Sequence, residues 1–268
     1  RRRGHHHART PRPLRGRAGR AGVVRGRNLG DEYLGAASGL AHWRDSHCRI
    51  EGPAVLALQL TFLEDWYWAT HNIPRLHWRP WLPSGGDRHV VVLPSGPADD
   101  VETCTLFFMH CITRAQKRLW IASPYFVPDL QILHALQLAS LRGVDVRVLI
   151  PENPDHRVVW LAAYSYLVQA ERAGVGIYRY KPGFMHQKVL LVDDRFAAIG
   201  TANLDNRSMR LNFEVNAIVE DETFVEEVER MLVRDLAQSR RMTAQDYRNR
   251  STLFRLACRA ARLMAPLL

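Results

Sequence analysis

Apolar and polar positions change their period repeatedly along residues 87–245, which indicates alternating strands and helices. Short apolar runs such as HVVVLPSG, RLWIASPYFVP and VDVRVLIPE predict strands, and the longer stretches between them have helical spacing. Further strands are predicted from GVGIYRYK, HQKVLLVDD, FAAIGTAN and NFEVNAIVED, and helices from residues 100–116, 129–142, 156–173 and 221–241. Strands that alternate with helices in this way predict an α/β fold in which helices cover a layered sheet.

The first 86 residues follow a different pattern. Residues 1–21 consist mainly of Arg, Gly, His, Ala and Pro without a periodic apolar pattern, which predicts a disordered or non-native segment. Residues 22–86 contain a short strand before Gly52, a helix from Pro53 to about Ala69, and a Trp-rich segment interrupted by prolines. That segment either wraps the domain core or forms an interfacial belt, because tryptophan suits the boundary between membrane and water.

Residues 246–268 predict a separate amphipathic, basic C-terminal helix. Arg255, Arg259 and Arg262 form one stripe of a helix that otherwise consists of Leu, Phe, Ala and Met. A basic stripe on an apolar helix is typical of a surface that contacts anionic lipids. The alternative is a terminal helix that packs on the core and leaves its arginines in water.

The formal net charge of +10 is concentrated at one end of the chain. Ten of the 37 basic residues lie within residues 1–27, and the remaining 27 are balanced by the 27 acidic residues. The rest of the chain is therefore neutral, which argues against a nucleic-acid partner. No run approaches the roughly 20 apolar residues that a membrane span needs, and the four scattered cysteines are typical of reduced, structural thiols.

The segment HQKVLLVDDRFAAIGTAN contains the main candidates for chemistry. His186, Lys188 and Asp193 have the spacing His-x-Lys-x4-Asp, and Gly200-Thr201-x-Asn203 follows. Because side chains two apart on a strand share a face, His186 and Lys188 are predicted to point inward together. A neutral imidazole can attack phosphorus and hold it as a phosphohistidine, while a neighbouring ammonium neutralises the phosphate oxygens. The chain has three lysines against 34 arginines, so a lysine at this position indicates a need for a compact charge.

Three further polar residues are predicted to support this pair. Asn203 follows a small Gly-Thr turn, from which its amide can donate to the same phosphate oxygens. Glu214, on the next strand, is predicted to hold the far nitrogen of the imidazole and to fix its tautomer. Asp193 has the opposite strand parity, so we assign it an electrostatic role without direct contact. The alternative is that His186 is a hydrogen-bonded core histidine and Lys188 a surface charge.

The motif resembles the His-Lys-Asp signature of the phospholipase D superfamily. The segments WIASPYFVPD, GIYRYKPGFMHQK and LDNRSMRLNFEVNAIV, with the earlier NLGDEYLG and WRDSHCRIEGPAV, are similar to bacterial cardiolipin synthases over residues 22–268. The resemblance implies a phosphatidyltransferase that joins two phosphatidylglycerol molecules into cardiolipin and releases glycerol, without a metal or another cofactor. It also implies a phospholipase D-like α-β-α sandwich with a mixed sheet, in which two such motifs face each other. One histidine takes the phosphatidyl group, and the other serves as acid and then as base.

The chain departs from that pattern near its N-terminus. Placing Arg25–Asn28 on the family's Gly-Gly-x-Asn puts the first motif's His, Lys and Asp at Pro11, Pro13 and Ala18, none of which has the required chemistry. One hypothesis is that residues 1–21 are a shifted-frame reading of a normal first motif, because GC-rich codons give Arg, Gly, Ala, Pro and His in any frame.

We therefore expect a complete C-terminal half over residues 87–245 and a truncated N-terminal half over residues 22–86. Asn28 and Asp45 are expected remnants of the first half-site. Three functions follow from this reading. The first is a cardiolipin synthase-type transferase, impaired by the missing motif and bound peripherally to the cytoplasmic face of the bacterial inner membrane, where it acts on phosphatidylglycerol and other anionic phospholipids. The second is a nuclease formed by two paired chains, and the third is an inactive membrane-associated remnant.

Overall fold

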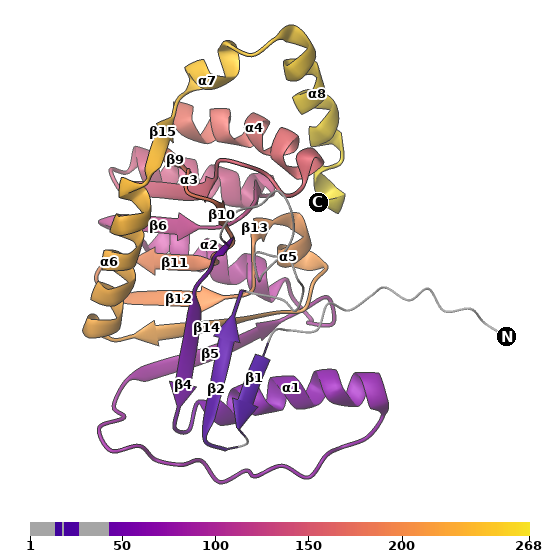
Figure 1. Cartoon of the computed structure of the whole chain (residues 1–268), viewed down its shortest axis with the longest axis vertical. Helices are drawn as coiled ribbons and strands as arrows, with labels where there is room; N and C mark the ends of the chain where they lie inside the picture. Colours follow the sequence, from indigo (N-terminus) through magenta and orange to yellow (C-terminus); the bar gives the residue numbers. More distant parts are fainter. Residues whose placement is uncertain (1–13, 18, 27–42) are drawn as a thin grey trace, which may run out of the picture.

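The computed structural model describes residues 14–17, 19–26 and 43–268, and its centre is one eight-stranded mixed sheet (Figure 1). The strand order across this sheet is β15-β9-β8-β6-β11-β12-β14-β5. Strands β6, β8 and β9 run parallel to one another, and every other pairing in the sheet is antiparallel. The strands are β5 (His89–Ser95), β6 (Arg118–Ala122), β8 (Asp145–Pro151), β9 (Gly176–Tyr180), β11 (Val189–Val192), β12 (Phe196–Gly200), β14 (Glu214–Glu220) and β15 (Ser239–Met242).

Helices cover both faces of the sheet, which confirms the predicted α-β-α sandwich (Figure 1). One face packs against α2 (Thr103–Arg114), α3 (Leu130–Leu141), α4 (Arg157–Arg172) and α8 (Thr252–Leu263). The other face packs against α6 (Glu222–Ala237), the N-terminal strands and α1 (Val55–Thr70). Alternate residues of β11 point into the two cores: Leu190 packs on the side of α2, α3, α4 and α8, and Leu191 packs on the side of α6 and α1.

The register of the central strands brings the predicted motif to one edge of the sheet. Because β11 runs antiparallel to β6, Val189 at the start of β11 pairs with Ala122 at the end of β6. The parallel neighbour β8 ends at the same edge, at Pro151. The segments that follow β6 and β8 therefore lie beside the residues that precede β11, which include His186 and Lys188.

The N-terminal part of the chain forms a small second sheet of strands β1 (Leu14–Arg17), β2 (Ala21–Arg25) and β4 (His47–Glu51). Val24, Cys48 and Ile50 of this sheet are buried against the same core as α6. The prediction of disorder for residues 1–21 is therefore wrong for residues 14–17, which pair antiparallel with β2. Backbone pairing across the turn at Gly19, whose φ is 69°, requires no periodic apolar pattern in the sequence.

A further short strand joins the N-terminal part directly to the motif. Strand β3 (Trp43–Arg44) pairs in parallel with β10 (Phe184–Met185), immediately before His186. Two other short pieces complete this edge: β7 (Phe126–Val127) pairs with β13 (Leu204–Asp205), and α5 (Asn206–Arg210) follows. The N-terminal part thus contributes backbone contacts to the site, in addition to covering the sheet.

The predicted helix over residues 221–241 ends earlier than expected. Helix α6 stops at Ala237, and residues 239–242 form β15 on the free edge of β9. Met242 fills the core, while Arg240 forms ion pairs with Glu152 and Asp246. These tertiary contacts outweigh the helical spacing of the sequence. A short helix that the sequence did not indicate, α7 (Ala244–Arg248), then leads to α8.

The C-terminal helix both packs on the core and exposes an apolar stripe. Cys258 and Ala261 of α8 are buried, and Phe254 contacts the rings of Trp160 and Tyr164 on α4. The opposite side leaves large apolar side chains in solvent: Leu253, Leu256, Leu263 and Met264. A short 3-10 helix, η2 (Ala265–Leu267), follows.

The Trp-rich segment does not wrap the core, because its four tryptophans (Trp66, Trp68, Trp78 and Trp81) are each between 41% and 52% exposed. In the part of the chain that the structure describes, no helix is both long and apolar enough to cross a membrane. All four cysteines are buried and unpaired.

Candidate active site

His186 is fixed at the sheet edge by the N-terminal part of the chain. Its backbone N–H donates to the carbonyl of Arg44 at 2.8 Å, which continues the pairing of β3 with β10. The imidazole is buried beside the rings of Trp43 and Phe184, whose centroids lie 5.1 and 5.9 Å away. Its Nδ1 lies 3.1 Å from Oδ2 of Asp45, a carboxylate that is itself 5% exposed.

The surroundings of His186 favour a neutral ring with a defined tautomer. Burial, together with the positive charge of Lys188, lowers the pKa of His186 below its usual 6.5, although Asp45 acts in the opposite direction. The imidazole is therefore uncharged at neutral pH. Because an ionised carboxylate only accepts hydrogen bonds, Asp45 assigns the ring proton to Nδ1, which leaves the lone pair on Nε2.

Lys188 lies with His186 in the segment between β10 and β11, not within a strand as predicted, and it contacts the imidazole ring. Its Nζ is 2.9 Å from both ring nitrogens and 2.8 Å from the His186 carbonyl oxygen. Burial lowers the pKa of Lys188 from 10.5 to about 8, and the charge of Asp45 opposes this shift. The side chain is therefore a compact buried cation at neutral pH, as its scarcity in the sequence indicates.

Gly26 lets the end of β2 pass close to this cluster. A Cβ at Gly26 would lie 2.7 Å from Oδ1 of Asp45 and 3.0 Å from Cδ of Lys188. Any side chain at this position would therefore displace the two residues that surround His186. The neighbouring Asn28, a predicted remnant of the first half-site, lies outside the described residues, as do Pro11, Pro13 and Ala18.

Gln187 lies between His186 and Lys188, and its hydrogen bonds fix this segment on the side away from their side chains. Its Oε1 accepts from the Ser46 hydroxyl at 2.6 Å, and its Nε2 donates to Asp235 at 2.7 Å. Arg44 donates to both oxygens of Asp235 at 3.1 and 3.0 Å. These contacts of Gln187 were not predicted, although its position between His186 and Lys188 indicates that its side chain points away from theirs.

Asp193 lies at the far end of β11 from His186, in a turn where its φ is 52°. Its carboxylate accepts hydrogen bonds from the backbone N–H groups of Gln116, Lys117 and Arg118, the shortest at 2.7 Å. The residue fixes the turn after β11 against the start of β6. Its observed contacts are therefore with the backbone, rather than with the site.

Glu214 does not occupy the place predicted for it, because the carboxylate at Nδ1 of His186 is that of Asp45. Glu214 is buried and accepts hydrogen bonds from the hydroxyls of Thr201 and Ser208 and from the amide of Asn212. Burial raises the pKa of Glu214 from 4.5 to about 7. The strand parity that turned Glu214 inward was correct, but three nearby donors satisfy the carboxylate.

Donation from the Asn203 amide to phosphate oxygens stays a prediction. The backbone N–H of Asn203 donates to the hydroxyl of Ser208 at 3.0 Å. The side-chain Oδ1 of Asn203 is buried and has no hydrogen-bond partner. The preceding Gly200 is required by close packing, because a Cβ there would lie 1.9 Å from Oδ1 of Asn216.

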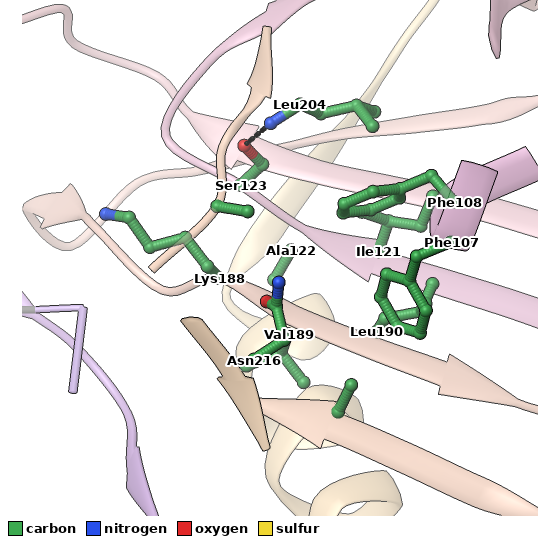
Figure 2. Close-up of a pocket in the computed structure, with 12 residues that line it drawn as sticks. Phe107, Phe108, Ile121, Ala122, Ser123, Lys188, Val189, Leu190, Leu204 and Asn216 are labelled. Carbon is green, nitrogen blue, oxygen red and sulfur yellow. Dashed lines mark hydrogen bonds between the residues drawn. The ribbon is translucent and has the colours of Figure 1, made fainter. Parts of the chain in front are cut away.

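Figure 2 shows how Lys188 leaves the sheet beside Ser123 and Asn216. The apolar side of this pocket, at Phe107 and Phe108, lies away from the Lys188 ammonium (Figure 2). The pocket has a volume of about 10 Å³, which is the space of one water molecule. A phosphate group must therefore approach Lys188 from the outer edge of the sheet, where the segments after β6 and β8 lie.

The buried His186–Lys188 pair lies at one edge of the sheet, and comparisons with known proteins identify the domain that contains it. Residues 108–236 match the family described as "Cardiolipin synthase, PLD-like domain". Over 250 residues, 93% of this chain, the chain is 52% identical to cardiolipin synthase A of Pseudomonas putida and 55% identical to that of Pseudomonas aeruginosa strain LESB58. Residues 108–236 therefore form a PLD-like domain of the cardiolipin synthase type, and 93% of the chain is similar to bacterial cardiolipin synthases. It spans about half the length of these relatives, 52% and 51% respectively.

Solved structures show the same fold. The phosphatidylserine synthase of Haemophilus influenzae Rd KW20 has a TM-score of 0.71 at 15% identity, covering 93% of this chain and 69% of that one. The phospholipase D family member Nuc from Salmonella typhimurium has a TM-score of 0.51 at 20% identity, covering 59% of this chain and 99% of that one. These similarities establish the phospholipase D-like architecture.

Proposed function

We propose that this chain transfers a phosphatidyl group through a phosphohistidine on His186, in a reaction of the cardiolipin synthase type. One observation carries the proposal: a buried, neutral imidazole is held at Nδ1 by Asp45, with the Lys188 ammonium 2.9 Å from the ring. The first contact directs the lone pair of Nε2 outward, and the second supplies a cation for phosphate oxygens. The relatives named cardiolipin synthase A support the substrate class.

The proposed reaction has two displacement steps. In the first, Nε2 of His186 bonds to the phosphorus of phosphatidylglycerol, the bond to the head-group oxygen breaks, and the released glycerol takes a proton from water. In the second, a hydroxyl oxygen of another phosphatidylglycerol bonds to phosphorus and gives its proton to water. The P–Nε2 bond then breaks, and its electron pair returns to the ring. The products are cardiolipin and glycerol.

The missing first motif is expected to slow these steps rather than to change them. A positioned general acid or base contributes about 10²–10⁴-fold to rate. Because proline stands at the aligned position of the first motif's histidine, Pro11, we propose that water carries both protons. His186 then performs the covalent step, and turnover is low.

We further propose that the chain acts on phosphatidylglycerol and other anionic lipids at a membrane surface, at the cytoplasmic face of the bacterial inner membrane. The exposed leucines of α8 lie beside Arg255 and Arg259, which is the arrangement that favours anionic lipid surfaces. The Trp-bearing end of α1 and the C-terminal end of the chain lie on the same side as α5 and β13 (Figure 1).

The test is incubation of the purified chain with vesicles of phosphatidylglycerol that carries labelled head-group glycerol. Cardiolipin and free glycerol should appear in equal amounts, and His186→Ala should abolish both. Glu227→Gln, an exposed change on α6, serves as the control that retains activity. Cleavage of DNA without turnover of lipid would indicate a nuclease instead, and inactivity toward both would indicate a remnant.

A further inference from the structure

A second polar pocket lies beside the His186–Lys188 pair and has no part in the chemistry described above. It has a volume of about 460 Å³, within the range of small-molecule sites. Three segments of the same sheet edge line it: Tyr125 after β6, residues 155–159 after β8, and residues 203–212. The pocket lies near the site: burial lowers the pKa values of His186 and Lys188, and the charge of Asp155 opposes both shifts.

The inner wall of the pocket is rich in hydrogen-bond acceptors. The Asp155 carboxylate is 14% exposed and accepts from the Tyr125 hydroxyl at 2.5 Å and from the His156 backbone N–H at 2.7 Å. Two oxygens of a carboxylate offer about four acceptor positions, so capacity is left for a ligand. Asn203 adds an Oδ1 that is buried without a partner, and Asp205 adds a second buried carboxylate. Such a wall requires a ligand that supplies O–H donors.

The rim of the same pocket carries the opposite charge. Arg157 and Arg207 line it, are exposed, and form no ion pair with any described residue. A guanidinium group is suited to the oxygens of a phosphate, because its planar fork of donors matches their geometry. The pocket therefore combines acceptors for hydroxyl groups inside with donors for a phosphate outside.

We propose that this pocket is the subsite for the acceptor's phosphoglycerol head group, with the glycerol hydroxyls on Asp155 and the phosphate at Arg157 and Arg207. The inference rests on the proposed function, because it assigns the second substrate of that reaction. It makes Asp155 and Tyr125 the residues that select a polyol over a choline head group. A trimethylammonium group has no hydroxyl to offer the inner acceptors, so a choline head group should bind more weakly.

A binding experiment tests the pocket without requiring turnover. The soluble probe is glycerophosphoglycerol, which is the head group without acyl chains, and the comparison ligands are glycerophosphocholine and inorganic phosphate. Titrations of the full chain, followed by NMR, should show at least about tenfold tighter binding of glycerophosphoglycerol than of glycerophosphocholine. Equal affinities for the two ligands would overturn the proposal.

Substitutions test the acceptor wall and the arginine rim of the pocket separately. Asp155→Asn and Tyr125→Phe should remove most of the preference for glycerophosphoglycerol, while Arg207→Gln should weaken all phosphate-bearing ligands alike. The matched controls are Glu227→Gln and Arg195→Gln, which change exposed residues on α6 and at the turn after β11. An unchanged preference in folded Asp155→Asn, as judged by its melting temperature and NMR dispersion, would refute the assignment.

A second measurement links the pocket to the reaction. If the phosphatidyl group on His186 is shared between lipid and water, Asp155→Asn should lower the ratio of cardiolipin to phosphatidic acid about tenfold. The amount of phosphohistidine should not change. Failure to form any phosphohistidine would contradict the proposed function alone, because the binding titrations test the ligand preference of the pocket independently of turnover. An unchanged product ratio in Asp155→Asn would contradict the pocket alone.

Discussion

Oδ2 of Asp45 lies 3.1 Å from Nδ1 of His186, although 141 residues separate the two along the chain. This contact joins the N-terminal part of the chain to the His186–Lys188 motif. It also determines which ring nitrogen carries the lone pair, because the carboxylate requires the proton on Nδ1.

Asp45→Asn should therefore strongly impair the reaction of His186, although Asp and Asn have nearly the same size. The amide can donate to Nδ1 and favour the wrong tautomer, and it withdraws the charge that raises the pKa of His186. We expect the rate of phosphohistidine formation to fall by at least about 10²-fold, on the scale seen when a histidine loses its orienting carboxylate. The ¹⁵N shifts of the ring report the tautomer. An unchanged rate with an inverted tautomer would show that Nε2 is not the reacting atom.

Lys188 should give the protein a specific dependence of stability on pH. Its folded pKa of about 8 lies below its ordinary 10.5, so between these values the unfolded chain binds a proton that the folded chain lacks. The contribution to stability is full above pH 10.5 and is lost as the pH falls through 8. Lys188→Met, which removes the ionisable group, should be more stable than the wild type at pH 7, and its advantage should shrink by pH 10.

Urea unfolding at the two pH values measures this difference, and a pH-independent difference would contradict it. The same titration should appear in activity, because loss of the ammonium above pH 8 removes the cation that stabilises phosphate. Transfer by the wild type should therefore decline on the alkaline side.

Asp193→Ala should destabilise the fold without acting on the chemistry directly. The substitution leaves the backbone N–H groups of Gln116, Lys117 and Arg118 without their acceptor, at a cost of about 3 kcal/mol. Asp194→Ala is the matched control, because that carboxylate is 59% exposed and its ion pairs contribute about 1 kcal/mol or less. Equal losses in urea unfolding for the two variants would refute the capping role.

The exposed stripe of α8 should govern membrane binding. Replacing Leu256 and Leu263 by Ser should weaken sedimentation with phosphatidylglycerol vesicles by about 100-fold, because each buried leucine contributes about 1.5 kcal/mol or more. Leu141→Ser, an exposed leucine at the end of α3, is the control. Equal binding of the variant and the wild type, or equal binding to phosphatidylcholine vesicles, would show that α8 is not the lipid contact.

The sequence predicted the parts of this architecture that follow from local periodicity. The strand-helix alternation follows from local periodicity. The predicted strand began too early, because His186 and Lys188 lie between β10 and β11, although their side chains are in contact as predicted. The contact between Asp45 and His186 could not be read from spacing, because it depends on how β3 pairs with β10. The structural role of Asp193 likewise depends on a left-handed turn and on the amides of a neighbouring strand.

Two other differences have the same origin in tertiary contacts. Residues 239–242 have a helical pattern but pair with the open edge of β9, where Met242 reaches the core. Glu214 points inward as expected, but it is satisfied by the hydroxyls of Thr201 and Ser208 before it can reach the imidazole. The helical pattern of residues 239–242 did not indicate a strand, whereas Glu214 faces inward as predicted and its partners lie close to it in the sequence.

The most direct test of the central claim is detection of the covalent intermediate. The chain is mixed with a short-chain phosphatidylglycerol, quenched at alkaline pH where phosphohistidine persists, and digested for mass spectrometry. The account predicts a phosphatidyl adduct on His186, released glycerol, and no adduct in His186→Ala. An adduct on another residue, or none in a folded chain that still forms cardiolipin, would contradict it.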